Sequence, residues 1–511
     1  MNSKLLKDRY RKDHILTLVI WLLIFVLTLI IHTRLINNAF DDAYIHFRIA
    51  RNFAESGQPY YNANEPVSAS SSPAWTIILS ILFKVFSPNP WVIAVLNSIC
   101  TTAGAYIFSL IFKKIYKEEL SIFITGLLIP ILFLSIMLVP SIGLMETPAT
   151  FVMIGITFLL YLHKNPVYYI ILGTLPFFRI ECGILVLIFL ISDVVEHKKI
   201  HPKMFLPAIG AMPFVFYQYF YFQTIIPNTI SAKMAMYHQT ALEIFGMVLQ
   251  SFFPNTKAFP IWSESVLLYV WLTILIFSIY FILRTNSITQ KSEMIFLAFG
   301  LSVLAFYIIG KALIFPWYVP LFTVPLLLGS CGCFLKQKKI PGYILFAVLV
   351  YPYVSLSGQN VFAGFFNPYI YTDVQFGARV VRYIDTGTRL FTHYPEARLM
   401  TSEIGGLGWG FNGYVLDGAG LATPAAIAYH DGSHGTLGII PIEFIRTTQP
   451  DIIVSVPIFL PGFSESELAN SYILKQVPVY MQNDLQRIES KEIWGNDLLH
   501  IYILKDIYGG F

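Results

Sequence analysis

The chain has 511 residues, of which 56% are hydrophobic and only 13% are charged. Together with a mean hydropathy of +0.63, this composition excludes an ordinary soluble globular protein and predicts a polytopic α-helical membrane protein. The net charge of +4 is small and the basic residues form short clusters between apolar runs, which excludes a nucleic-acid-binding surface. The four cysteines lie in or beside apolar segments and predict neither a disulfide framework nor a zinc site.

The first apolar run, residues 15–32, follows a basic N-terminal segment. It is long enough to span a bilayer and has no small-residue cleavage site behind it, which predicts a transmembrane helix rather than a removed signal peptide. Since basic flanks stay in the cytoplasm, we expect the following loop, residues 33–90, on the outer side of the membrane.

This outer loop begins with a polar stretch of helical periodicity. One stripe of the predicted helix carries Asp41, Tyr44, Arg48, Arg51 and Glu55. We expect the helix to lie in the membrane interface with its charges toward a cavity, because the other arc is apolar and consists of Ile45, Phe47, Ile49, Ala50, Phe53 and Ala54. Asp42 falls off the stripe, one turn before His46. The alternative is that Asp41 only caps the helix and that the charges form a solvated face.

Residues 75–86 are too short to span the membrane and predict an interfacial helix, as do residues 241–253. Further spans are predicted at 91–112, 120–139, 149–162, 166–178, 182–195, 204–222, 265–283, 293–310, 317–335 and 341–356. This gives about eleven spans, with the N-terminus inside and the C-terminal region outside. The Lys and Arg count agrees, since the inner segments carry 17 and the outer loops before residue 357 carry eight.

From residue 357 onward the apolar runs shorten and alternate with turns. The pattern predicts a small extracytoplasmic α/β domain over residues 357–511, after a transmembrane catalytic domain over 1–356. Strands are expected at 398–404, 414–417, 451–456 and 500–505, and helices at 374–391 and 441–448. Glu403, Asp417 and His430 lie in Gly-rich loops, where ordinary turn chemistry explains them as well as acceptor recognition does.

Several short motifs occur in order along the chain, all on the outer side of the predicted topology. They are D-D-A-Y-I-x-F-R-x-A-R-N (41–52), S-S-S-P-A-W (70–75), G-L-M-E-T-P (143–148), F-R-I-E (178–181), P-N-T-I-S-A-K (227–233), F-P-W-Y (315–318), S-E-I-G-G-L-G-W (402–409) and V-L-D-G-A-G-L (415–421). In this order they resemble the GT-C superfamily of integral-membrane glycosyltransferases, closest to its terminal arabinofuranosyltransferase branch. That family usually has R-P-E-G where this chain has Arg-Ile-Glu-Cys at 179–182.

The resemblance implies a GT-C fold and a sugar donor carried on polyprenyl phosphate, with the phosphate as leaving group. The chain has no P-loop and no dinucleotide fingerprint that would bind a nucleotide sugar. Such a transfer needs a base for the acceptor hydroxyl and cations for the departing phosphate. Asp41 is the candidate base, and Asp42 either replaces it or orients the acceptor. The adjacent carboxylates are also a candidate site for a divalent cation, so the metal requirement stays open.

Cations at headgroup depth favour anionic lipid groups, which makes candidate phosphate ligands of Arg48, Arg51, Arg179, Lys233 and Lys311. Glu146 and Glu181 lie at span edges, where a charge needs a partner or a substrate. For Arg179 and Glu181 the alternative is a structural ion pair, and for Trp317 and Tyr318 it is an interfacial aromatic belt. The remaining candidate substrate-binding residues are Tyr44, His46 and Asn228.

The leading hypothesis is a glycosyltransferase of a bacterial plasma membrane. It would move a pentose or hexose, arabinofuranose among them, from a polyprenyl-phosphate donor to an envelope glycan, a lipid or an exported protein. The alternative is a transporter or flippase of lipid-linked sugars, a class that commonly shows internal repeats and polar groups at the bilayer midplane. Here the polar motifs gather at the outer edge and no repeat is visible, which favours the transferase.

Overall fold

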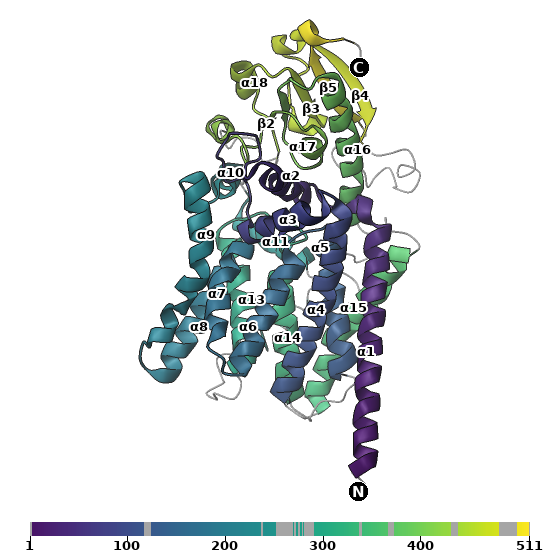
Figure 1. The fold of residues 1–511 in the computed structure, drawn as a ribbon, viewed down its shortest axis with the longest axis vertical. Coiled ribbons are helices and arrows are strands. Elements are labelled where there is room, and N and C mark those ends of the chain that lie inside the picture. The colour runs from purple at the N-terminus through teal and green to yellow at the C-terminus, as the bar shows by residue number, and fades with distance from the viewer. Residues whose placement is uncertain are drawn as a thin grey trace.

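The computed structural model describes residues 3–116, 124–236, 239–251, a few positions between 269 and 280, 291–336, 340–365, 372–430, 438–479 and 498–509. A long helix bundle carries a smaller domain with a β-sheet at one end, and a layer of short helices separates the two parts (Figure 1). The N-terminal end of the chain lies at the far end of the bundle from the sheet (Figure 1). The predicted combination of a helical part with a small C-terminal α/β domain is confirmed.

The apolar segments form helices, because only a helix satisfies the backbone hydrogen bonds of such a run without water. The bundle contains α1 (Ser3–Arg34), α4 (Pro90–Tyr116), α5 (Ile129–Ile142), α6 (Thr147–Leu162), α7 (Val167–Phe178), α8 (Cys182–His197), α9 (Leu206–Phe222), α13 (Lys291–Ile309), α14 (Pro320–Lys336) and α15 (Ile340–Phe365). Each predicted span overlaps one of them except 265–283, which lies largely outside the described residues. Among the described helices, Pro90–Tyr116 and Ser292–Ile309 are long and apolar enough to cross a membrane. The count of eleven spans stays a prediction.

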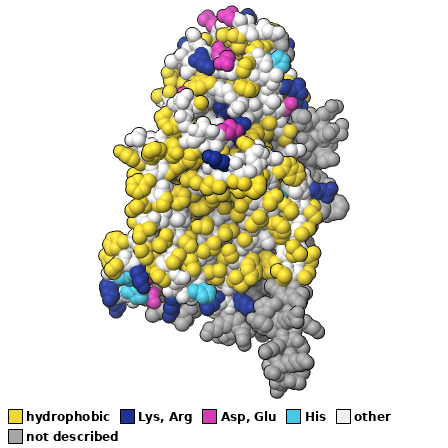
Figure 2. All heavy atoms as spheres, in the orientation of Figure 1, with side chains coloured by type: hydrophobic (Ala, Val, Ile, Leu, Met, Phe, Trp, Pro, Cys, Tyr) yellow, Lys and Arg dark blue, Asp and Glu magenta, His cyan; other side chains and the backbone are white. Residues whose placement is uncertain are grey.

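Hydrophobic side chains cover the face of the bundle that Figure 2 shows. More than half of each side chain is exposed at Leu187 and Val195 on α8 and at Phe216 and Phe220 on α9. Soluble proteins rarely expose so extensive an apolar surface, whereas a lipid bilayer would cover it. Lys, Arg and His side chains gather at the end of the bundle away from the sheet (Figure 2). The surface is that of an integral-membrane protein.

The C-terminal domain contains a five-stranded sheet of order β2-β1-β3-β5-β4. Its strands are β1 (Leu399–Thr401), β2 (Val415–Asp417), β3 (Ile452–Ser455), β4 (Tyr472–Pro478) and β5 (Leu498–Leu504), and its helices are α16 (Thr372–His393), α17 (Gly406–Gly410) and α18 (Ile442–Thr448). β1 is parallel to β2 and β3, whereas β5 is antiparallel to β3 and β4. The sequence did not predict β4, an edge strand in which only Tyr472 is buried. The boundary expected at residue 356 falls inside α15, and the division into domains stays a prediction.

The layer between the two parts consists of α2 (Asp41–Ser56), α3 (Pro73–Phe86), α10 (Asn228–Met236) and α11 (Ala241–Ser251) (Figure 1). One face of α2 packs in the core of the bundle through Ala43, Tyr44, Phe47 and Ala50. A second face packs in the core of the C-terminal domain through Ile45 and Ile49. The prediction of a single apolar side turned to the membrane is therefore wrong, because protein covers α2 from two sides.

Close backbone contacts fix the start of α2. A Cβ atom at Gly143 would lie 2.2 Å from the Phe40 ring, and one at Gly405 would lie 1.9 Å from the Asp41 carbonyl oxygen. Only glycine leaves the necessary room at these two positions. The Phe40 N–H also donates to the Gly143 carbonyl at 3.2 Å. These motif glycines let the α5–α6 turn and the C-terminal domain both touch the beginning of α2.

Candidate active site

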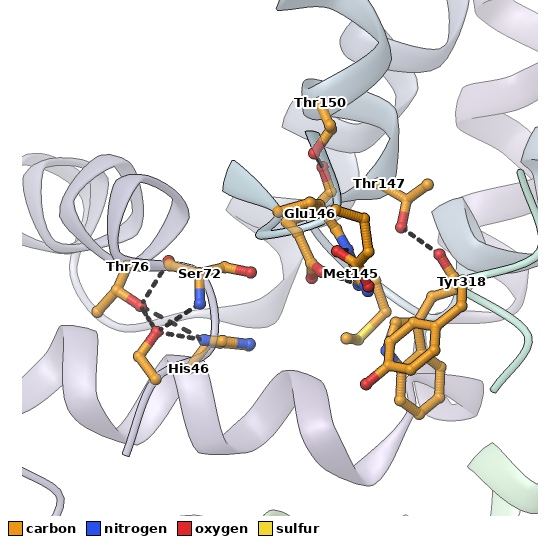
Figure 3. A network of polar contacts seen from close by, with 12 residues as sticks. His46, Ser72, Thr76, Met145, Glu146, Thr147, Thr150 and Tyr318 are labelled. Atoms are coloured by element: carbon orange, nitrogen blue, oxygen red, sulfur yellow. Dashed lines mark hydrogen bonds and ion pairs between the residues drawn. The ribbon is translucent and has the colours of Figure 1, made fainter. Parts of the chain in front are cut away.

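Several of the sequence motifs meet at the junction between the bundle and the C-terminal domain. Figure 3 shows His46 and Thr76 on one side and Glu146, Thr147 and Tyr318 beside them. These residues come from α2, α3, the start of α6 and the turn before α14. The fold thus brings together segments that are far apart in the sequence.

Arg179 is the centre of a buried ion network. Its Nη1 lies 2.6 Å from Glu146 Oε1, and its Nη2 lies 2.7 Å from Glu181 Oε1. Tyr307 donates to the same Glu181 oxygen at 2.7 Å, and the Arg179 guanidinium lies 4.2 Å from the centre of the Tyr318 ring. The second Glu146 oxygen is buried and has no partner among the described residues. The structural ion pair is present, and it leaves a carboxylate oxygen for a substrate or water.

Asp42 lies beside this network. Its carboxylate is half-buried and makes no hydrogen bond or ion pair to the part of the chain that the structure describes. Burial is the main cause that raises the pKa of Asp42 to about 6. The charge of Lys233 acts to lower this pKa, and the charges of Asp41 and Glu146 act to raise it. At neutral pH the group is therefore a carboxylate with lone pairs available, which is what a general base requires.

Asp41, in contrast, is held by the C-terminal domain. Its Oδ2 accepts a hydrogen bond from the Gly405 N–H at 2.9 Å, and its Oδ1 accepts one from the Gly406 N–H at 2.7 Å. Burial raises the pKa of Asp41 to about 7, and the nearby Glu403 carboxylate acts in the same direction. Glu403 is paired with Arg379 at 3.4 Å. Asp41 therefore caps the start of α17 rather than the start of its own helix α2.

Arg48 and Arg51 hold the loop 408–413 rather than facing a cavity. The buried Arg48 donates from Nε to the Tyr61 carbonyl at 2.9 Å, and its Nη atoms donate to the carbonyls of Gly408, Phe411 and Gly413. Arg51 Nη2 donates to the Asn412 side chain at 2.7 Å. The structure does not place either guanidinium beside Asp42. The prediction that Arg48 binds phosphate differs from this arrangement, because its N–H groups already have oxygen acceptors that helix periodicity does not reveal. For Arg51 phosphate binding stays a prediction, since its Nε is buried without a partner among the described residues.

Lys233 on α10 is a cation beside Asp42. Its Nζ donates to the Tyr318 hydroxyl at 2.8 Å and lies 5.5 Å from the centre of that ring. Trp317 stacks on Phe315 with 4.8 Å between ring centres and is part of the bundle core. Of the two aromatic residues predicted to bind substrate, Tyr318 therefore contacts the charged groups and Trp317 serves packing.

Three other predicted residues lie outside this group. Asn228 Nδ2 donates to the Gly420 and Leu421 carbonyls in the loop after β2, at 2.8 and 2.9 Å. Tyr44 is buried with its ring 6.0 Å from that of Trp409. Lys311 is exposed in the turn after α13. Asn228 and Tyr44 thus attach the C-terminal domain to the bundle.

Sequence reasoning missed Ser70, Thr76, Tyr307 and Arg379. Ser70 and Thr76 bind the His46 imidazole, and the run of hydroxyl residues in S-S-S-P-A-W was the available signal. Tyr307 lies inside an apolar run, 126 residues from the Glu181 that it binds. No local pattern reveals a pairing over that separation.

The adjacent carboxylates have different surroundings: Asp41 accepts hydrogen bonds from backbone amides, whereas Asp42 lies near Lys233. Within the described ranges, no group of three or more His, Cys, Asp or Glu side chains is arranged to hold a metal ion. A divalent cation at this pair stays a prediction from sequence.

The chain resembles known proteins in its fold and not in its sequence. No protein-family model and no curated protein sequence matches the chain. The crystal structure of ArnT from Cupriavidus metallidurans bound to undecaprenyl phosphate matches with a TM-score of 0.57 at 9% identity, covering 98% of this chain and 99% of that one. ArnT from the same organism in the apo state gives 0.52 at 8% identity, covering 98% and 100%. The likeness concerns the fold alone: the chain has a fold similar to that of ArnT.

Proposed function

We propose that this protein is a membrane glycosyltransferase that moves a sugar from a polyprenyl-phosphate donor to a hydroxyl acceptor. The observation that carries the proposal is the half-buried Asp42 carboxylate, which has no side-chain partner in the described ranges and lies beside Lys233. A carboxylate of this kind next to a cation is the minimum that glycosyl transfer from a phosphate needs. The fold supports the proposal, since ArnT with the same fold binds undecaprenyl phosphate.

In this mechanism Asp42 takes the proton of the acceptor hydroxyl. The acceptor oxygen attacks the anomeric carbon of the sugar as the bond from that carbon to the phosphate oxygen breaks. The phosphate leaves with the electron pair as polyprenyl phosphate, and Lys233 compensates its developing charge. A single displacement with one base and no enzyme nucleophile inverts the anomeric configuration.

We propose Asp42 rather than Asp41 as the base. Each oxygen of Asp41 already accepts a hydrogen bond from a backbone amide, whereas Asp42 accepts none from the described residues. Arg179 has two carboxylate partners, so its proposed role is to hold Glu146 at the edge of the site. Glu146 Oε2, buried without a partner among the described residues, would then accept a hydrogen bond from a substrate hydroxyl.

The donor sugar is proposed to be a pentose or hexose, arabinofuranose among them, and the acceptor an envelope glycan, lipid or exported protein, as the motif resemblance implies. The C-terminal domain would lie outside a bacterial plasma membrane. The basic side chains at the opposite end of the bundle support this orientation (Figure 2). Reporter fusions at Phe511 test it, and a cytoplasmic signal there contradicts the proposed placement of the site.

The activity test uses purified protein, radiolabelled synthetic polyprenyl-phosphate pentoses and hexoses, and a membrane extract as the source of acceptors. We expect transfer of label to the extract with release of polyprenyl phosphate, and none from nucleotide sugars. Efficient use of a nucleotide sugar with no use of the lipid donors would overturn the mechanism. Movement of labelled lipid across vesicles without any transfer would instead support the transporter alternative.

A further inference from the structure

His46 is held from one side only. It lies on α2 one turn after Asp42 and is 3% exposed. Its Nδ1 lies 3.1 Å from Ser70 Oγ and 3.3 Å from Thr76 Oγ1 (Figure 3 shows His46 and Thr76). Its Nε2 makes no hydrogen bond to the residues that the structure describes. The ring therefore has one anchored nitrogen and one available nitrogen.

A hydroxyl network surrounds the Nδ1 side of the ring. Thr76 Oγ1 lies 3.3 Å from the Ser72 carbonyl oxygen, and the Ser72 N–H donates to Ser70 Oγ at 3.2 Å. The Ser70 and Thr76 hydroxyl oxygens are 2.8 Å apart. If Thr76 donates to the Ser72 carbonyl and Ser70 donates to Thr76, Nδ1 is the donor to the hydroxyls and Nε2 carries a lone pair. If Thr76 donates to Ser70 and Ser70 donates to Nδ1, Nε2 carries the hydrogen. In either tautomer Nε2 has one hydrogen bond to make.

The ring is also neutral. Burial is the main cause that lowers the pKa of His46 to about 4; the charge of Glu146 acts to raise this pKa, and the charges of Lys233 and Arg179 act to lower it. In the neutral ring Nε2 is either a donor or an acceptor, and a hydroxyl group, which can both donate and accept, is a suitable partner in both cases.

We propose that His46 Nε2 makes a hydrogen bond with a non-reacting hydroxyl of the transferred sugar and so determines which donor sugar is used. This inference rests on the proposed function. His46 and Asp42 both lie within electrostatic range of Lys233, which is the proposed phosphate ligand. The sugar is bonded to that phosphate and carries hydroxyl groups, so one of these hydroxyls is the partner that Nε2 meets. Ser70 is the positioning residue that fixes the ring.

The test compares the parent polyprenyl-phosphate sugar with analogues that each lack one hydroxyl. Wild-type protein is expected to lose kcat/KM by about 10- to 100-fold on one analogue, the cost of a polar group left without its partner. His46→Asn keeps an amide near the position of Nδ1 but removes Nε2. The kcat/KM of His46→Asn for the parent donor should be lower than that of wild type by the same factor, and it should not fall further when the analogue replaces the parent donor.

His46→Gln places an amide group, which can accept or donate, near the position of Nε2 and should recover part of the discrimination. Ser70→Ala keeps Nε2 but frees the ring, so it should lower kcat/KM modestly and keep the preference for the hydroxyl. Thermal unfolding of each variant in detergent checks that it is folded.

If His46→Asn discriminates among the analogues as wild type does, His46 is a packing residue and the inference is overturned. The same holds if wild type uses every analogue as well as the parent donor. Failure of wild type to use the parent donor at all is a separate result, which contradicts the proposed function and this inference with it.

Discussion

The two sides of helix α2 carry similar charges but differ in what those charges touch. On the side of the C-terminal domain, Asp41 and Arg48 are bound by backbone amides and carbonyls. On the side of the bundle, Asp42 and His46 retain a carboxylate and a ring nitrogen without a hydrogen-bond partner among the described residues. The first side attaches a domain and the second is available to a ligand.

A polar stripe on a helix therefore indicates that its side chains make polar contacts, but not whether the partner is the protein or a ligand. Asp41 and Arg48 fall on one stripe with regular helical spacing. Yet a buried guanidinium that donates to several carbonyls has no donor left for phosphate. In this fold, the groups that lack a protein partner mark the site better than the groups that align.

The largest effect is expected for Asp42→Asn. The amide cannot take a proton, so turnover should fall by about 100- to 10,000-fold, the usual contribution of a positioned general base. Single-turnover rates with the lipid donor measure this, and donor affinity should change little. Turnover within a factor of a few of wild type removes Asp42 as the base.

Replacing Lys233 should weaken donor binding. In Lys233→Met, loss of a charged hydrogen bond to the phosphate is expected to raise the Kd of the polyprenyl-phosphate donor by about 10- to 100-fold. Lys311→Met is the matched control, since Lys311 is exposed in a neighbouring turn. Equal effects of the two substitutions would show that overall charge, rather than the position of Lys233, governs binding.

Arg48→Lys tests the attachment side of α2. A lysine cannot reproduce the guanidinium fork, so carbonyls of the loop 408–413 lose donors, and we expect the junction to open more easily by about 2 to 4 kcal/mol. Hydrogen exchange of residues 405–413 measures the opening free energy. Arg389→Lys, on an exposed face of α16, should leave that exchange unchanged. An unchanged exchange in Arg48→Lys contradicts its role in holding the loop.

The pH dependence separates the two carboxylates. Burial raises the pKa of Asp42 to about 6, and the base must be deprotonated to work. Activity should therefore rise with pH, about tenfold per unit below that pKa, and level off above it. Profiles of kcat/KM for wild type and Asp41→Asn should share this inflection. Its disappearance in Asp41→Asn would assign it to Asp41.

Asp41→Asn should have the smallest effect. The amide oxygen still accepts one of the two N–H groups of Gly405 and Gly406, so we expect a loss of about 1 kcal/mol in junction stability and a change in turnover well below that of Asp42→Asn. Hydrogen exchange and single-turnover rates measure the two effects. A loss of turnover equal to that of Asp42→Asn would return the role of base to Asp41.

The sequence by itself determined the architecture. Long apolar runs allow only helices in a membrane, so each predicted span outside 265–283 overlaps a helix, and the predicted strands of the C-terminal domain are present. The motif order indicated that Glu146, Arg179 and Lys233 belong near one site. The ion network and the placement of Lys233 beside Asp42 agree with that expectation.

Only the tertiary structure decided which polar groups have hydrogen-bond partners within the protein. Helix periodicity gives the direction of a side chain, but the partner comes from a segment hundreds of residues away. Arg48 and the carbonyl of Phe411 are 363 residues apart. The same reason separates Asp41 from Asp42, because the glycine backbone of α17 covers one carboxylate and leaves the other without a partner in the described chain.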